Sequence, residues 1–221
     1  MNSPIDLKLR VMAAVQRTPS PPRSRLRRET QIVALVTFAV AAGLFFAFDG
    51  MKHGAGRPAW FLAASLGVWA AVAASASLGA WRRGTSFAKG SVASLVAIAV
   101  GTPLLLQAIS IAFAWSHPAL AALHAERIGF RCFALTLAAA TCPLVGLSIV
   151  RRSSNPMHPI ASGAAFGVAS GACAGLMVIL WCPVAAPMHM AVGHVLPIAF
   201  LAVIGSVLGH HVMAIRTARL R

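Results

Sequence analysis

The chain has 221 residues, of which 58% are hydrophobic and only 10% are charged, and its formal net charge is +15. A soluble domain carries roughly a quarter of charged residues, so the composition excludes an ordinary soluble fold and indicates an integral membrane protein. An excess of Lys and Arg is typical of the cytoplasmic segments of such proteins and does not by itself indicate nucleic-acid binding.

The first 30 residues form a basic extension. They contain no apolar core of the kind found in a cleavable signal peptide, so we expect the extension to remain attached. A short apolar stripe at helical spacing precedes a proline-rich break in this segment. A stripe of this kind suits a groove in a partner protein, and a membrane-surface helix or an unstructured tail are the alternatives. The residues of the stripe are Leu7, Val11, Met12 and Val15.

Six apolar segments follow, and each has room for the roughly 20 helical residues that a bilayer requires. Barrel strands would instead show shorter segments of alternating polarity. We therefore expect an all-α integral membrane protein with a six-helix domain over residues 31–215 and a short basic tail over residues 216–221. The predicted spans are residues 31–48, 59–81, 92–113, 129–150, 159–181 and 190–215.

The basic residues predict the orientation of this bundle. The extension, the connections after the second and fourth spans, and the tail all carry Lys or Arg and lie on the same side. The positive-inside rule places that side, and with it both termini, in the cytoplasm. No acidic residue lies deep in any span. Because carriers of protons or cations usually need such a residue, this pattern argues against a transporter.

The fifth predicted span carries a glycine at every fourth position. This spacing produces a stripe of small residues on one helix face, which lets another helix approach closely. Helix packing is the expected role, and a pore or a ligand groove is the alternative. The stripe consists of Gly163, Gly167, Gly171 and Gly175.

Two of the four cysteines are expected at the same depth. Cys132 lies near the start of the fourth span and Cys182 at the end of the fifth, and these spans are antiparallel neighbours. Thiols at an oxidising outer face can form a disulfide or bind a soft metal ion. A buried apolar role is the alternative for both, and it is the expected role of Cys142 and Cys173. No pair has the C-x-x-C spacing of a zinc knuckle or a thioredoxin-type motif.

The segment after Cys182 is rich in further candidate ligands for a soft metal ion. We expect at most a transient ion there and no resident cofactor, because each of these side chains could equally fill the core or the interface. The candidates are Met188, His189, Met190 and His194.

Enzymatic function is not expected. The sequence has no Ser/His/Asp arrangement, no paired carboxylates and no phosphate-binding loop, and its four acidic residues leave few candidates for general acid–base catalysis. A permease for a metal ion or small solute, using the outer Met, His and Cys residues, is the alternative to a regulatory function.

Three segments of the chain resemble the NrsF-type family, whose name stands for negative regulator of sigma F. Members of this family are bacterial membrane anti-sigma factors with six spans. The resemblance covers mainly residues 129–215. It is carried by TCPLVGLSIVRR (141–152), by HPIASGAAFGVASGACAGLMVILWCP (158–183) and by the His-x-x-Pro pattern of His194 and Pro197.

The resemblance implies a multi-pass protein of the bacterial inner membrane that holds an extracytoplasmic-function sigma factor away from RNA polymerase, without binding nucleic acid itself. The apolar stripe of the extension would then bind the sigma factor. The resemblance also implies that two outward-facing cysteines, by position Cys132 and Cys182, sense heavy-metal or oxidative stress and cause release. It leaves open the identity of the sigma factor, the oligomeric state, and the choice between a disulfide and a bound metal ion.

Overall fold

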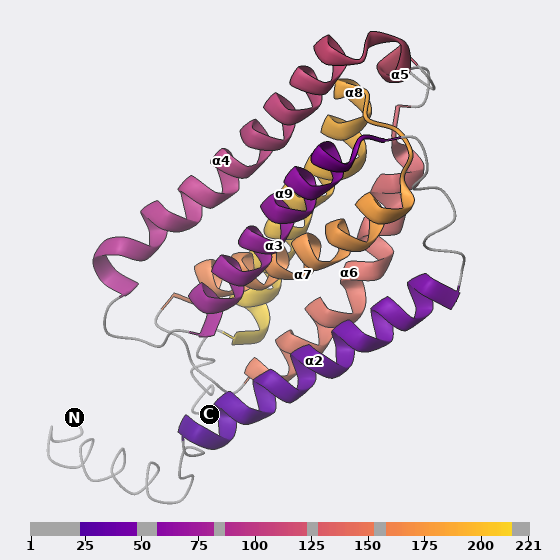
Figure 1. The fold of residues 1–221 in the computed structure, drawn as a ribbon. Coiled ribbons are helices and arrows are strands. Elements are labelled where there is room, and N and C mark those ends of the chain that lie inside the picture. Colours follow the sequence, from indigo (N-terminus) through magenta and orange to yellow (C-terminus); the bar gives the residue numbers. More distant parts are fainter. Residues whose placement is uncertain (1–22, 48–56, 82–86, 123–127, 153–157, 214–221) are drawn as a thin grey trace, which may run out of the picture.

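The computed structural model describes residues 23–47, 57–81, 87–122, 128–152 and 158–213. All regular structure in these ranges is helical (Figure 1). The segment from α8 to η2 is one continuous helix interrupted by two wider π-helical turns, η1 and η2. The elements are α2 (Arg23–Ala47), α3 (Ala59–Trp81), α4 (Phe87–Ser116), α5 (Pro118–Ala122), α6 (Phe130–Arg151), α7 (Pro159–Trp181), α8 (Pro187–Met190), η1 (Ala191–Val195), α9 (Leu196–Leu208) and η2 (Gly209–Met213).

The predicted all-α architecture is confirmed. Within the described residues, five helical segments are long and apolar enough to cross a membrane, and in α4 the apolar part with described side chains is Gly101–Ser116. The first helix of the described residues, α2, begins at Arg23, and its apolar segment begins at Arg28, close to the predicted residue 31. The apolar stripe of the extension and the basic tail lie outside the described residues. The five segments are Arg28–Ala47, Ala59–Ser77, Phe130–Arg151, Pro159–Trp181 and Pro187–Met213.

Helix α7 lies at the centre of the bundle (Figure 1). The surrounding helices bury 78% of its apolar segment, compared with 11% to 33% for the other four segments. Its main neighbours are α9, α3 and α6. The outer helices leave large apolar side chains exposed, as helices in contact with lipid must. Helix α7 is therefore the element against which the others are positioned.

The backbones of α7 and α9 approach each other without intervening side chains. A Cβ atom on Gly163 would collide with the backbones of Gly205 and Gly209, and one on Gly167 would collide with the carbonyl of Leu201. Only glycine permits this separation, because any larger residue would push the two helices apart. The contact therefore fixes the position of α9 relative to α7.

The other two glycines of the predicted stripe face side chains instead of backbone. A Cβ atom on Gly171 would lie 2.9 Å from Leu201 Cδ1, and one on Gly175 would lie 3.1 Å from the ring of Trp69 on α3. Trp69 is 1% exposed. The stripe thus packs against two helices, α9 at its start and α3 at its end.

A substitution at Gly167 tests whether the α7–α9 contact stabilises the fold. Gly167→Ala should destabilise the protein by about 1–3 kcal/mol, because the added methyl group overpacks the contact. Gly43→Ala on α2 is the matched control, since a Cβ atom there meets nothing within 4 Å, and it should leave stability unchanged or slightly raised. Thermal unfolding in detergent measures both. Equal unfolding temperatures for the two variants would contradict the packing role.

Candidate functional site

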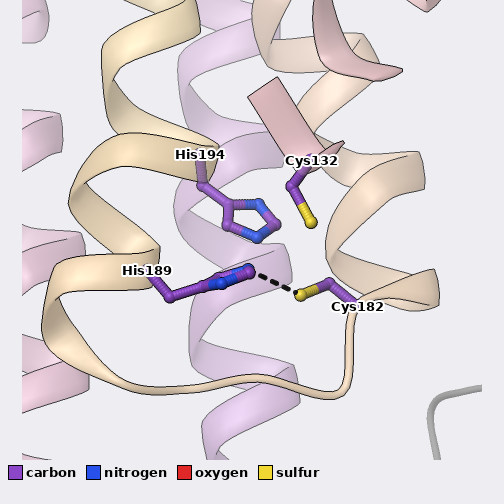
Figure 2. A group of neighbouring side chains, drawn as sticks. All are labelled: Cys132, Cys182, His189 and His194. Carbon is purple, nitrogen blue, oxygen red and sulfur yellow. Dashed lines mark hydrogen bonds between the residues drawn. The ribbon is translucent and has the colours of Figure 1, made fainter. Parts of the chain in front are cut away.

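Four side chains with metal-binding or redox chemistry meet at one end of the bundle (Figure 2). Cys132 comes from the start of α6, Cys182 directly follows α7, His189 belongs to α8 and His194 to η1. The sulfur atoms and one nitrogen of each ring all lie within 4.8 Å of one another. All four residues are buried, with exposed fractions between 0% and 4%. We refer to them below as the Cys2His2 cluster.

The short link between α7 and α8 brings His189 close to Cys182. The Cys182 backbone is extended (φ −77°, ψ 119°), and its N–H donates the last hydrogen bond of α7, to the Val178 carbonyl. Pro187 occupies the first turn of α8, where a missing N–H costs nothing. The His189 Nε2 atom then lies 3.1 Å from the Cys182 sulfur. The thiol and the imidazole are thus in hydrogen-bond contact because α7 ends just before Cys182 and α8 begins again at Pro187.

The π-helical turn η1 places His194 beside His189. In an α-helix, residues five positions apart point about 140° away from each other, whereas the i to i+5 hydrogen bonds of a π-turn bring them to nearly the same side. Such a bond joins the Leu196 N–H to the Ala191 carbonyl. The two imidazole rings are 5.6 Å apart.

Pro197 gives a physical reason for the wide turn. A proline lacks the N–H that would bond to the carbonyl four residues earlier, and its ring collides with that carbonyl. For Pro197 this carbonyl belongs to Gly193, which lies inside η1. The wider turn relieves the conflict, and the same adjustment rotates His194 toward the cluster.

Two glycines allow α6 to approach η1. Gly129 precedes α6 in the left-handed region, with φ 105°, where glycine is strongly favoured. A Cβ atom on Gly129 would lie 2.9 Å from both Gly193 N and the His189 carbonyl, and one on Gly193 would lie 3.1 Å from the Cβ atom of Cys132. Side chains at either position would therefore separate Cys132 from the histidines.

His194 is the least satisfied member of the cluster. Its side chain is 0% exposed, and among the described residues neither Nδ1 nor Nε2 has a hydrogen-bond partner. Buried imidazole nitrogens without partners are rare, because they have lost their hydrogen bonds to water and have formed no hydrogen bond within the protein. This arrangement leaves both nitrogens of His194 available to a ligand.

The surroundings of Cys182, just beyond the apolar segment of α7, favour its thiolate. The hydrogen bond from the Cys132 thiol lowers the pKa of Cys182 well below its ordinary value. Burial acts in the opposite direction, and the hydrogen bond with His189 adds to the lowering. The lowered pKa favours the thiolate of Cys182, which is the form that attacks electrophiles and binds metal ions.

A pocket of about 380 Å³ leads to the cluster and is lined by both cysteines and His189. At its rim, the Arg131 guanidinium lies over the Trp181 ring at 4.8 Å, a cation–π distance. On another side, Arg57 Nη2 donates to the Ile179 carbonyl at 2.6 Å. Sequence reasoning missed Arg57, because nothing in the pattern joins it to the end of α7.

The remaining candidate ligands and the other two cysteines differ in their burial. Met188 is 66% exposed, and Met190 is buried in an apolar cluster separate from the one that contains the two cysteines. Cys142 is exposed and Cys173 is partly buried. The structure therefore brings together Cys132, Cys182 and the two histidines.

Comparison with known proteins identifies a family. The family model described as NrsF, negative regulator of sigma F, matches residues 14–214. This range includes every described helix and all four residues of the Cys2His2 cluster. No curated protein and no solved structure matches the chain significantly.

The lowered pKa of Cys182 is testable by alkylation in a chain carrying Cys142→Ser and Cys173→Ser. The rate at Cys182 should change little between pH 8 and pH 6, because the thiolate is lost only when the pH falls through its lowered pKa. An ordinary thiol loses about tenfold per pH unit in this range. Cys132→Ala removes the main cause of the lowering and should restore that steep dependence. Mass spectrometry of the alkylated peptide gives the rates, and a steep profile in the parent chain would contradict the assignment.

Proposed function

The chain belongs to the NrsF family of negative regulators of sigma F, and from this premise we propose that it is a membrane-bound anti-sigma factor with a thiol sensor. In this proposal it holds an extracytoplasmic-function sigma factor at the bacterial inner membrane. It releases the sigma factor when heavy metal or oxidant reaches Cys132 and Cys182.

The observation that carries the proposal is the convergence of two thiols that are distant in sequence. Cys132 and Cys182 come from different helices, are 3% and 1% exposed, and lie within 4.8 Å of each other at the sulfur atoms. Both proposed stimuli act on such a pair. An oxidant that accepts two electrons can join the sulfurs in a disulfide, with loss of the two thiol protons, once they move to bonding distance. A soft metal ion can bind both thiolates at once.

The distribution of charge supports an outward-facing sensor. Helix α6 begins next to the Cys2His2 cluster and ends at Arg151, and its 22 residues span about 33 Å. Arg152 follows directly. The positive-inside rule assigns this arginine pair, together with the basic extension, to the cytoplasm. The cluster then lies near the periplasmic face, one membrane thickness away from the proposed sigma-binding segment.

A stimulus at this distance can act only by favouring one bundle state over another. Linking the two cysteines ties the start of α6 to the turn after α7, so it favours the state in which these segments are closest. A tenfold change in sigma-factor affinity requires about 1.4 kcal/mol of such preference.

Removing residues 1–22, the part of the extension that carries the apolar stripe, tests the regulatory half of the proposal. A chain of residues 23–221 keeps all of α2. In mild detergent, at least tenfold less sigma factor should co-purify with this chain than with the full chain. A full-length Leu7→Asp/Val11→Asp variant should behave in the same way, because charges disrupt the apolar stripe. Undiminished co-purification with both chains would contradict sigma binding by the extension.

Replacing the thiols tests the sensor half. Cys132→Ser and Cys182→Ser should retain repression of a sigma-dependent reporter but lose its induction by cadmium or oxidant, because serine neither binds soft ions well nor forms a disulfide. Cys142→Ser and Cys173→Ser are matched controls outside the cluster and should respond normally. Normal induction in the first two variants would rule out the sensor.

A further inference from the structure

We propose that Cys132, Cys182, His189 and His194 form a single four-ligand site for a divalent cation of the zinc class, Zn²⁺ or Cd²⁺. This inference names the metal chemistry of the proposed sensor, and for its regulatory meaning it rests on the proposed function. The binding itself depends only on the four side chains.

The donor set selects the class of ion. Two thiolates and two imidazoles form the S2N2 set of tetrahedral zinc sites. Calcium and magnesium require oxygen ligands, and the cluster offers none from its side chains. Sulfur donors favour zinc-class and softer ions over hard ones.

The positions of the donors fit one small ion. With metal–sulfur bonds of about 2.3 Å and metal–nitrogen bonds of about 2.0 Å, the donors of a tetrahedral site are roughly 3.3–3.8 Å apart. Here all four donor atoms lie within 4.8 Å of one another, and the Cys182 sulfur lies 3.1 Å from His189 Nε2. Closing the site requires the donor atoms to move by about 1 Å, which a small shift of α6 against α7 together with side-chain rotation supplies.

His194 supplies an observation independent of the cysteines. Its ring is completely buried, neither nitrogen has a hydrogen-bond partner among the described residues, and Figure 2 shows the ring facing both thiols. A histidine with a purely structural role would be expected to have at least one of these nitrogens bonded. A metal ion accounts for the orientation of this unpartnered ring, which the wide η1 turn before Pro197 directs toward the thiols.

The charge of the complete site also suits its surroundings. A divalent cation with two thiolates and two neutral imidazoles is formally neutral, so an apolar environment penalises it far less than it would an isolated ion. The ion binds the thiolate forms of both cysteines, which couples affinity to pH. The pocket that reaches both cysteines and His189 gives the ion an entry path.

Metal binding can be measured on the full-length chain in detergent without any sigma factor. After treatment with a chelator, the chain should bind one Co²⁺ per molecule with the visible absorption of a tetrahedral thiolate complex, and Zn²⁺ or Cd²⁺ should displace it. Cys182→Ser and His194→Asn should each weaken binding at least tenfold. Cys142→Ser and the exposed His210→Asn are matched controls and should bind normally.

A second measurement avoids variants that fail to fold. X-ray absorption of the zinc-loaded parent chain should reveal two sulfur and two imidazole nitrogen ligands at about 2.3 and 2.0 Å. No stoichiometric binding, normal affinity in His194→Asn, or a ligand shell without imidazole would each overturn the proposal. Because no sigma factor is present, a failure here leaves the anti-sigma function standing, and a failure of sigma co-purification leaves the metal site standing.

Discussion

The direct backbone contact between α7 and α9 is the constraint on which the rest of the structure depends. Gly163 and Gly205 leave no room for side chains between the two helices, so α9 has one position against α7. That position determines where the chain must return after Cys182 and where α8 and η1 begin. A second glycine contact, between Gly129 and Gly193, then fixes the start of α6 on η1. The Cys2His2 cluster is the point at which these contacts converge.

This construction explains how a small change at the cluster can affect the whole bundle. Closely packed helices do not deform gradually, because their interiors are as dense as crystals. A bond or an ion that draws Cys132 toward Cys182 must move α6 as a unit against α7, and small shifts of this kind are amplified by packed interfaces with two alternative arrangements. Since α6 ends at Arg151 on the opposite side of the bundle, such a movement reaches the proposed cytoplasmic face without an additional relay.

The helices and the proximity of Cys132 to Cys182 were predictable from sequence, whereas the selection of His189 and His194 among the candidate ligands was not. Apolar length determines a membrane helix, and antiparallel connection places Cys132 level with Cys182. His189 and His194 were both candidates, but an α-helical register points them about 140° apart. The local sequence pattern does not predict the π-turn that places the two rings next to each other. Met188 and Met190 were equally suitable candidates by sequence; Met188 is exposed, and Met190 is buried among apolar side chains. Arg57 and Gly129 contribute through tertiary contacts that no sequence spacing encodes.

The central claim is that occupation of the Cys2His2 cluster and retention of the sigma factor are coupled. The most direct measurement is a titration of Cd²⁺ into the purified complex of the full chain with its sigma factor, following sigma-factor dissociation and bound metal together. The account predicts that the sigma factor dissociates in step with the binding of one ion per chain, and that Cys182→Ser prevents both events. A sigma factor that stays bound at full metal occupancy would contradict the account.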